Sequence, residues 1–138
     1  MKRICLIILA VVSFSLSLSA TNPSENNSNK TFLNIDWAGG QAIVDSDLIL
    51  YVNGECIGTY SYLDGFRVKC PLSKEVMEVK IILKLGPVKR KSECKFFVNK
   101  QNNYTLMIMS NNPYNILDLF GFNLVNNDTN EMVKLKNL

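Results

Sequence analysis

Apolar and polar residues alternate along much of this chain, and that pattern restricts the folds open to it. Between residues 77 and 85 every second residue is apolar, and most of the residues between them are glutamate or lysine. Successive side chains of a β-strand point to opposite faces of a sheet, so this period predicts a strand with one buried face. Residues 31–138 contain no helical period that lasts three turns. The chain is therefore expected to be all-β.

Short turn signals separate these alternating segments. Asn53-Gly54 is the strongest of them, because both central residues of a type I′ hairpin turn need a positive φ angle. Asp64-Gly65 is interpreted as a second hairpin turn, and Gly86-Pro87 also predicts a turn. Residues 116–125 are apolar, and their pattern leaves a strand and a short helix open. The segments expected to be strands are 31–36, 48–52, 56–62, 66–70, 77–85, 88–98, 104–108 and 132–135.

This spacing predicts a small two-sheet β-sandwich of about seven to nine short antiparallel strands. A small barrel is the alternative that the same spacing allows. The expected organisation is a signal peptide over residues 1–20, a flexible polar leader over 21–30, and one domain over 31–138 with an apolar C-terminal segment.

The first 20 residues predict export. Lys2 and Arg3 form a short positive region, residues 4–14 are almost all apolar, and residues 13–20 end in small side chains. This order is typical of a secretory signal peptide, and the apolar part is shorter than the roughly 20 residues that span a membrane. We therefore expect cleavage near residue 20 rather than retention as an anchor, and no membrane span in the mature chain. The mature protein is placed in the periplasm, at the cell surface or outside the cell.

The mature chain is close to neutral. Removing Lys2 and Arg3 lowers the 15 basic residues to 13, against 12 acidic ones, so the net charge falls from +3 to about +1. A chain this close to neutrality lacks the positive field that is typical of nucleic-acid-binding proteins. We expect no nucleic-acid partner.

The sequence contains no histidine. Histidine is the usual general base, the commonest metal ligand and the usual partner of a serine or cysteine nucleophile. Asp45 and Asp47 lack the glycine and the distal glutamate of a calcium loop, which favours a solvated turn. Asp118 is interpreted as a turn cap or a solvent-facing side chain rather than a buried functional carboxylate. We therefore expect no enzyme activity, no cofactor and no metal site.

Three cysteines follow the predicted export signal. Alternation places Cys70 and Cys94 on inward faces, and two states stay open for them. A disulfide would close a loop of about 24 residues and contribute roughly 3 kcal/mol. Alternatively, both are buried thiols that pack as small apolar groups.

The third cysteine is assigned by hairpin register. If Asn53-Gly54 is a two-residue loop, Tyr51 faces Cys56 and Leu50 faces Ile57. That register puts Cys56 on the outer face as a free thiol. An exposed thiol and exposed edge strands are compatible with a monomer or a weak homodimer.

Two groups of side chains are candidates for a binding surface. Lys89, Arg90 and Lys91 form the main basic cluster, which could bind phosphate, an acidic polysaccharide or anionic headgroups. The same cluster is also typical of an edge strand, where lysine discourages pairing between molecules. Tyr60 and Tyr62 are expected on one face of the second hairpin, as an exposed recognition patch or as cross-strand packing.

The stretch LILYVNGECIGTYSY, residues 48–62, resembles the opening of PEGA-type domains and related small exported bacterial β-sandwich domains of unknown function. Gly58 in this pattern allows a β-bulge or a close backbone approach. The chain departs from the family where Thr59-Tyr60 replaces Thr-Pro, and where residues 73–75 replace a Gly-x-His. The resemblance implies a non-enzymatic β-sandwich of an exported or surface protein. The residues that match the family pattern are Leu50, Val52, Asn53, Gly54, Ile57 and Gly58.

These inferences predict an exported, non-enzymatic module that binds an envelope protein or glycan through a sheet face or a loop end. A secreted effector or inhibitor that blocks a host or competitor protein is the alternative.

Overall fold

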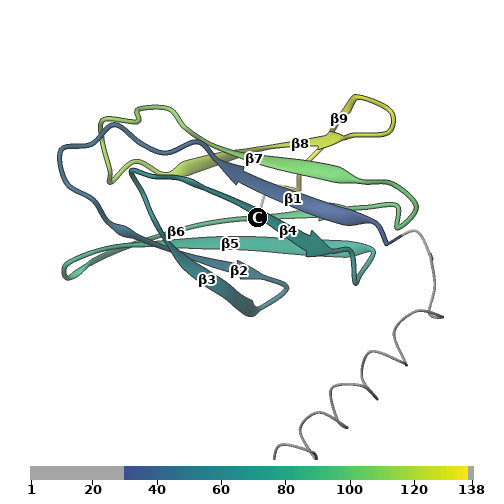
Figure 1. The fold of residues 1–138 in the computed structure, drawn as a ribbon, viewed down its shortest axis with the longest axis horizontal. Coiled ribbons are helices and arrows are strands. Elements are labelled where there is room, and N and C mark those ends of the chain that lie inside the picture. The colour runs from purple at the N-terminus through teal and green to yellow at the C-terminus, as the bar shows by residue number, and fades with distance from the viewer. Residues whose placement is uncertain (1–29, 137–138) are drawn as a thin grey trace, which may run out of the picture.

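The computed structural model describes residues 30–136, which form two stacked β-sheets without a helix (Figure 1). The predicted signal peptide and nearly all of the predicted leader lie outside the described residues. Among the residues described, no helix has the length and apolar character needed to cross a membrane. The strands are β1 (Phe32–Trp37), β2 (Asp47–Val52), β3 (Glu55–Ser61), β4 (Phe66–Pro71), β5 (Val76–Leu85), β6 (Val88–Phe97), β7 (Tyr104–Ser110), β8 (Phe120–Asn126) and β9 (Glu131–Val133).

The predicted two-sheet β-sandwich is confirmed. The five-stranded sheet has the order β4-β1-β7-β8-β9, and the four-stranded sheet has the order β3-β2-β5-β6. All neighbouring strands are antiparallel except β1 and β7, which are parallel. The expectation of a purely antiparallel sandwich is wrong at that pair. Parallel neighbours need a long crossover connection, and here the crossover contains the whole four-stranded sheet.

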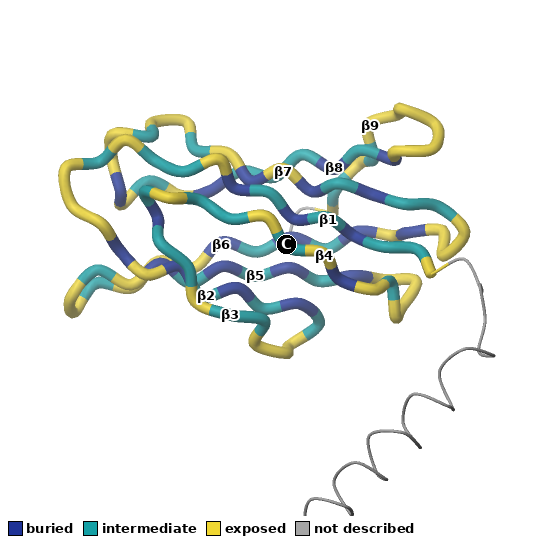
Figure 2. Tube along the Cα trace, viewed as in Figure 1, coloured by how far each residue is buried: buried dark blue, intermediate teal, exposed yellow. Residues whose placement is uncertain are grey.

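The core lies between the two sheets and follows the predicted alternation. Met77, Val79, Ile81 and Leu83 of β5 are at most 1% exposed. In Figure 2 buried and less buried positions alternate along β5, as expected for a strand with one face in the core. The inward positions predicted for β7 are buried as well. The alternation therefore identified the buried face of both strands correctly.

The Asn53-Gly54 hairpin is confirmed between β2 and β3. The φ angles are 51° at Asn53 and 82° at Gly54, as a type I′ turn requires. Tyr51 lies opposite Cys56, which is the predicted pairing. The turn therefore sets the register of the first pairs of the hairpin.

The register changes one residue further on. Leu50 lies opposite Gly58 rather than Ile57, so Ile57 is the extra residue of a β-bulge. The bulge that the sequence placed at Gly58 is thus present, while the predicted pairing of Leu50 with Ile57 is wrong. A Cβ atom on Gly58 would lie 2.8 Å from the Tyr60 hydroxyl oxygen. Glycine at this position leaves room for the tyrosine ring.

Asp64-Gly65 is a turn, but it is not a hairpin turn. Gly65 has a φ angle of 73°, as expected for a turn glycine. The strands on either side belong to different sheets, because β3 pairs with β2 and β4 pairs with β1. The second predicted hairpin is therefore a crossing between the sheets. A turn signal indicates a change of direction, and it carries no information about which strand the next segment will pair with.

The segment left open between helix and strand is divided. Residues 111–119 form a loop with short turns, and β8 begins at Phe120. Ile116 and Phe120 are buried and anchor the loop to the core. The predicted last edge strand is present as β9, at the outside of the five-stranded sheet.

Candidate binding surface at one end of the sandwich

Two long loops meet at one end of the sandwich. Residues 38–46 connect β1 to β2, and residues 111–119 connect β7 to β8. The Gln41 N–H donates to the Pro113 carbonyl oxygen at 2.9 Å, which joins the two loops directly. In Figure 1 they lie at the left, with the β3–β4 crossing and the β5–β6 turn. We call this region the loop end.

Tyr62 holds the loop end together from the inside. It is 1% exposed. Its carbonyl oxygen accepts hydrogen bonds from Trp37 Nε1 at 2.9 Å and from the Gly40 N–H at 2.8 Å. Its own N–H donates to the Ser46 carbonyl at 2.9 Å, and its hydroxyl donates to the Pro113 carbonyl at 3.0 Å. Burial raises the pKa of Tyr62, so the hydroxyl keeps the proton that it donates.

Three aromatic rings form the floor beneath the loops. The Trp37 ring lies 5.4 Å from the Tyr62 ring and 5.1 Å from the Phe120 ring, measured between centroids. The contact with Phe120 is edge-to-face, which is a favoured geometry for aromatic pairs. Because Phe120 begins β8 and Trp37 ends β1, the cluster joins both loops to the five-stranded sheet.

Asp45 braces the first loop from outside. Its carboxylate accepts hydrogen bonds from the Ser61 hydroxyl at 2.7 Å, the Ser46 N–H at 2.9 Å and the Leu63 N–H at 3.1 Å. The Ser61 hydroxyl and the backbone N–H groups hold the pKa of Asp45 below its usual value of 3.8, against a smaller opposing effect of burial. The sequence treated this aspartate as part of a solvated turn, and it is exposed. Its bonds also fasten residues 38–46 to the β3–β4 crossing.

We expect Asp45→Asn to make the protein less sensitive to acid. Because the folded pKa lies below the unfolded value of about 3.8, the ionised group stabilises the fold above that pH. This contribution is lost as the pH falls through the folded pKa. Thermal unfolding at neutral pH and at several pH values below 3.8 measures the effect.

The matched control for Asp45→Asn is Asp47→Asn, two residues along the chain and also exposed. Asp45→Asn should lower stability at neutral pH and should make stability fall less steeply as the pH is lowered. Asp47→Asn should have neither effect. Equal pH profiles for the two variants would contradict the bracing role.

Several large apolar side chains are exposed on the two loops. Ile43 is fully exposed at 102%, and the others in this group are 38–69% exposed. Exposed apolar side chains are common when scattered, but a group gathered at one end of a domain is typical of an interaction site. The opposite end has polar turns at residues 53–54, 99–103 and 127–130, and the paired residues Val76 and Phe97 are its exposed large apolar side chains among the residues described. The apolar loop surface, as we name it, consists of Ile43, Val44, Tyr114, Leu117 and Leu119.

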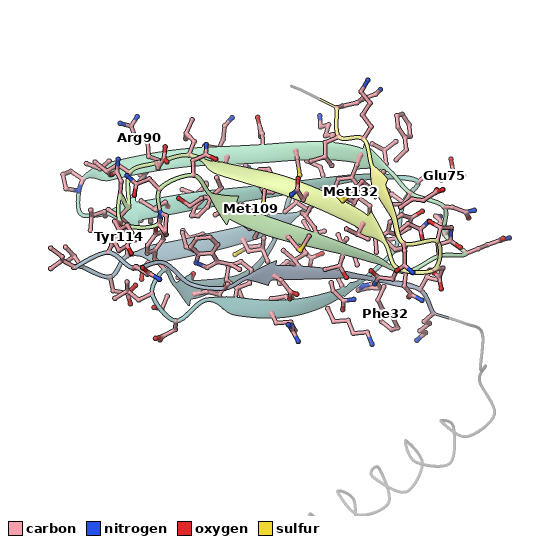
Figure 3. All side chains as sticks on the ribbon, turned by 90° about the horizontal axis from the view of Figure 1, so that it is seen from above. Phe32, Glu75, Arg90, Met109, Tyr114 and Met132 are labelled. Carbon is pink, nitrogen blue, oxygen red and sulfur yellow. The ribbon has the colours of Figure 1, made fainter. Side chains whose placement is uncertain are left out.

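Charges around the apolar loop surface are balanced. Lys84, Lys89 and Arg90 lie near the β5–β6 turn, and acidic residues lie on the loops and on the crossing. Figure 3 shows Arg90 and Tyr114 at the same end of the molecule. The surface therefore has no strong preference for a highly charged partner. The acidic residues are Asp45, Asp64 and Asp118.

A shallow groove opens on the outer side of the five-stranded sheet, beside the β3–β4 crossing. Its volume is about 620 Å³. Arg67 Nε donates to Asp36 Oδ1 at 2.9 Å along its wall, and the Arg67 side chain is 82% exposed, so this ion pair stabilises little. Neither residue of this pair was a predicted site residue. The residues that line it include Asp36, Arg67, Met107 and Met109.

Of the two alternatives for Tyr60 and Tyr62, packing is present and an exposed patch is not. Tyr62 is buried, and Tyr60 is half-buried with its ring stacked on Phe66 at 4.5 Å between centroids. The β-bulge explains why Tyr60 packs inward. Without the extra residue Tyr60 would face outward, and the bulge turns every later side chain of β3 to the other face. The packing alternative weighed for these tyrosines is the one present.

The basic cluster is exposed, as predicted for a surface group. Lys89, Arg90 and Lys91 lie on β6 at the edge of the four-stranded sheet. The Lys91 ammonium lies 3.1 Å from the Glu93 carboxylate. The cluster is adjacent to the apolar loop surface, because the Ser92 hydroxyl accepts the N–H of Phe120 at the end of the second loop.

Cys70 and Cys94 are buried free thiols, and the structure has no disulfide between them. Cys70 lies on β4 of one sheet and Cys94 on β6 of the other. Burial raises the pKa of Cys94 to about 12 and also raises the pKa of Cys70, with a further contribution from Glu55. Cys56 is exposed, as expected from the hairpin register.

Alkylation should therefore distinguish the three thiols. In the folded protein, iodoacetamide should modify Cys56 and leave Cys70 and Cys94 unmodified, because buried protonated thiols are poor nucleophiles. In denaturant without reductant, all three should be modified, as read by mass spectrometry of the peptides. Protection of Cys70 and Cys94 that persists in denaturant and disappears on reduction would instead show the disulfide.

The fold and this site define a β-sandwich with a rigidly braced apolar end. None of residues 30–136 belongs to a cluster of three or more cysteine, aspartate or glutamate side chains that could hold a metal ion. No known family model matches the chain, and no similar protein was found among curated proteins or solved structures. The resemblance of residues 48–62 to PEGA-type domains stays a prediction. The residues that sequence analysis missed, such as Ile43 and Val44, are visible in the sequence as an apolar run inside a loop.

Proposed function

We propose that this chain is an exported, non-enzymatic binding module that holds a protein partner on its apolar loop surface. The observation that carries the proposal is the exposure of Ile43, Val44, Tyr114 and Leu119, which are 54–102% exposed on two hydrogen-bonded loops. Burying these side chains against a partner would contribute the hydrophobic stabilisation that the folded chain alone does not use. The predicted signal peptide supports action outside the cytoplasm.

The bracing of the loops supports binding rather than accidental exposure. Tyr62 and Asp45 together make seven hydrogen bonds, of which four join residues 38–46 to residues 61–63. The Pro113 carbonyl joins the first loop to the second by accepting the Gln41 N–H. A surface that is ordered before binding loses little conformational entropy when it binds. Such bracing would favour a specific partner over loose adhesion.

The chemistry of the surface favours a protein over a glycan. Four of the five side chains are aliphatic and offer no hydrogen bond to a sugar hydroxyl, while aliphatic and aromatic groups are usual at the centre of protein interfaces.

A photocrosslinking amino acid at position 44 tests this proposal, and the same amino acid at position 132 is the control. Val44 and Met132 have similar exposure, 59% and 62%, but Met132 lies on β9, away from the loops. We expect a specific protein adduct from position 44 and none from position 132. Ile43→Asp should lower affinity for that protein by about tenfold or more, with unfolding unchanged.

Equal crosslinking from both positions, or full binding by the Ile43→Asp variant, would contradict the proposal. The origin of the crosslinked protein separates the two roles considered for the module. A partner from the producing cell's envelope corresponds to an envelope interaction module. A host or competitor protein corresponds to a secreted effector or inhibitor.

A further inference from the structure

The four outer strands of the sandwich differ in how well they could accept another strand. An edge strand presents unpaired backbone groups, and native proteins usually blunt such edges. Three of the outer strands are blunted: β3 has the bulge at Ile57, β4 ends in Pro71, and β9 has three residues. The fourth, β6, has ten residues and pairs with β5 over its whole length without a register shift. It is the longest regular edge.

The backbone groups that point away from β5 can be identified. The Val98 N–H donates to the Glu75 carbonyl on the β5 side, and the Lys95 carbonyl accepts the Lys136 N–H on the other side. The backbone N–H and C=O groups of successive residues in a strand point to alternate sides. Those of Lys89, Lys91 and Glu93 therefore point away from β5, as those of Lys95 do. Within residues 30–136 the C-terminal tail bridges this edge at Lys95, and residues 88–93 have no strand beside them there.

At residues 89–91 both faces of this free edge are open to solvent, whereas Ser92 is buried. Lys89, Arg90 and Lys91 are three consecutive exposed residues, although neighbours in a strand point to opposite faces. Figure 3 shows the Arg90 side chain pointing away from the sandwich. An added strand would therefore meet no side-chain layer on either side of this part of β6.

We propose that the free edge of β6, residues 88–93, receives an extended acidic segment of a partner protein as a fifth strand of the four-stranded sheet. The positive charges beside this edge favour an acidic segment. Lys89, Arg90 and Lys91 lie together, and Lys84 faces Lys89 across the hairpin. Among residues 30–136, Glu93 is the only acidic residue that forms an ion pair with the cluster. Two copies of this edge would repel each other, whereas an acidic strand would be attracted.

The register predicts the sequence pattern of the segment. Lys89 and Lys91 project from the outer face of the sheet, so acidic residues at every second position of the added strand would lie beside them. The alternate positions would face the side of Ser92, which is buried toward the core, and would suit β-branched residues. The site is separate from the apolar loop surface and goes beyond the proposed function.

Fluorescence anisotropy with a labelled peptide of alternating glutamate and valine tests the proposal. The control peptide has glutamine in place of glutamate, and a third has N-methyl groups on the backbone nitrogens of alternate residues. We expect saturable binding of the acidic peptide to the mature protein, with affinity about tenfold or more weaker for both other peptides.

Lys91→Pro and Lys91→Gln are the matched protein variants. Both substitutions remove the charge of Lys91. Proline also removes the backbone N–H that points away from β5, and it leaves the backbone hydrogen bonds between β5 and β6 in place. Edge positions of this kind tolerate proline. We expect affinity for the acidic peptide to be about tenfold weaker in Lys91→Pro than in Lys91→Gln. The N-methylated peptide gives the same information without altering the protein.

The proposal is overturned if the acidic peptide does not bind, if the glutamine peptide binds equally well, or if N-methylation has no effect. Equal affinities for the two Lys91 variants would also overturn it. Ile43→Asp should bind the peptide as the wild type does. Loss of peptide binding in that variant would place the peptide on the apolar loop surface, which would refute the edge site and leave the proposed function standing.

Discussion

Trp37→Ala should destabilise the protein by about 4 kcal/mol, a large fraction of the stability of a domain of this size. The indole is 5% exposed and packs on both Tyr62 and Phe120. Its Nε1–H donates to the Tyr62 carbonyl at 2.9 Å. Alanine would leave a cavity in the aromatic floor and would remove one of the bonds that order the loop end. Urea unfolding followed by circular dichroism measures the change in the free energy of unfolding.

Trp37→Phe is the control, because it keeps an aromatic ring and loses the indole N–H. We expect a cost of about 1 to 2 kcal/mol, since the Tyr62 carbonyl still accepts the Gly40 N–H. Binding to the loop-end partner should also fall more in Trp37→Ala than in Trp37→Phe. A cost below about 1 kcal/mol for alanine would mean that the aromatic floor is not part of the stable core.

Gly65→Ala is expected to be the second severe substitution, with a cost of at least about 3 kcal/mol. Gly65 has a φ angle of 73°, which disfavours any residue with a Cβ atom. A Cβ there would also lie 2.3 Å from the Trp37 carbonyl oxygen and 2.7 Å from the Gly39 nitrogen. Both obstacles are backbone atoms, so the crossing would have to move away from the end of β1.

Gly54→Ala separates the two causes of that cost. Gly54 has a similar φ angle of 82°, but nothing lies within 4 Å of the position that a Cβ would occupy. The conformational strain alone should cost about 1 kcal/mol. Thermal unfolding of both variants compares them directly. Similar melting temperatures would show that the close approach of the crossing to β1 contributes little.

The loop end illustrates why its residues were hard to find from the sequence. Ile43 and Leu119 are 76 positions apart in the chain, and they lie on two loops that the hydrogen bond between Gln41 and Pro113 joins. Conversely, Tyr60 and Tyr62 have the composition of a recognition patch, but the bulge and the crossing direct them inward. Whether each of these side chains is exposed or buried depends on contacts with residues far away in the sequence, and a local pattern does not contain those residues.

Local sequence by itself determined most of the strands, with β8 the exception, as well as where the Asn53-Gly54 hairpin turns and which face of β5 is buried. These features depend on the φ preferences of neighbouring residues and on alternation within one strand, so a short window contains them. The tertiary structure decided that β3 and β4 join different sheets, that β1 lies parallel to β7, and that two distant loops form one apolar surface. Those outcomes depend on which distant segments bury each other's apolar faces, and that competition is settled only when the whole core assembles.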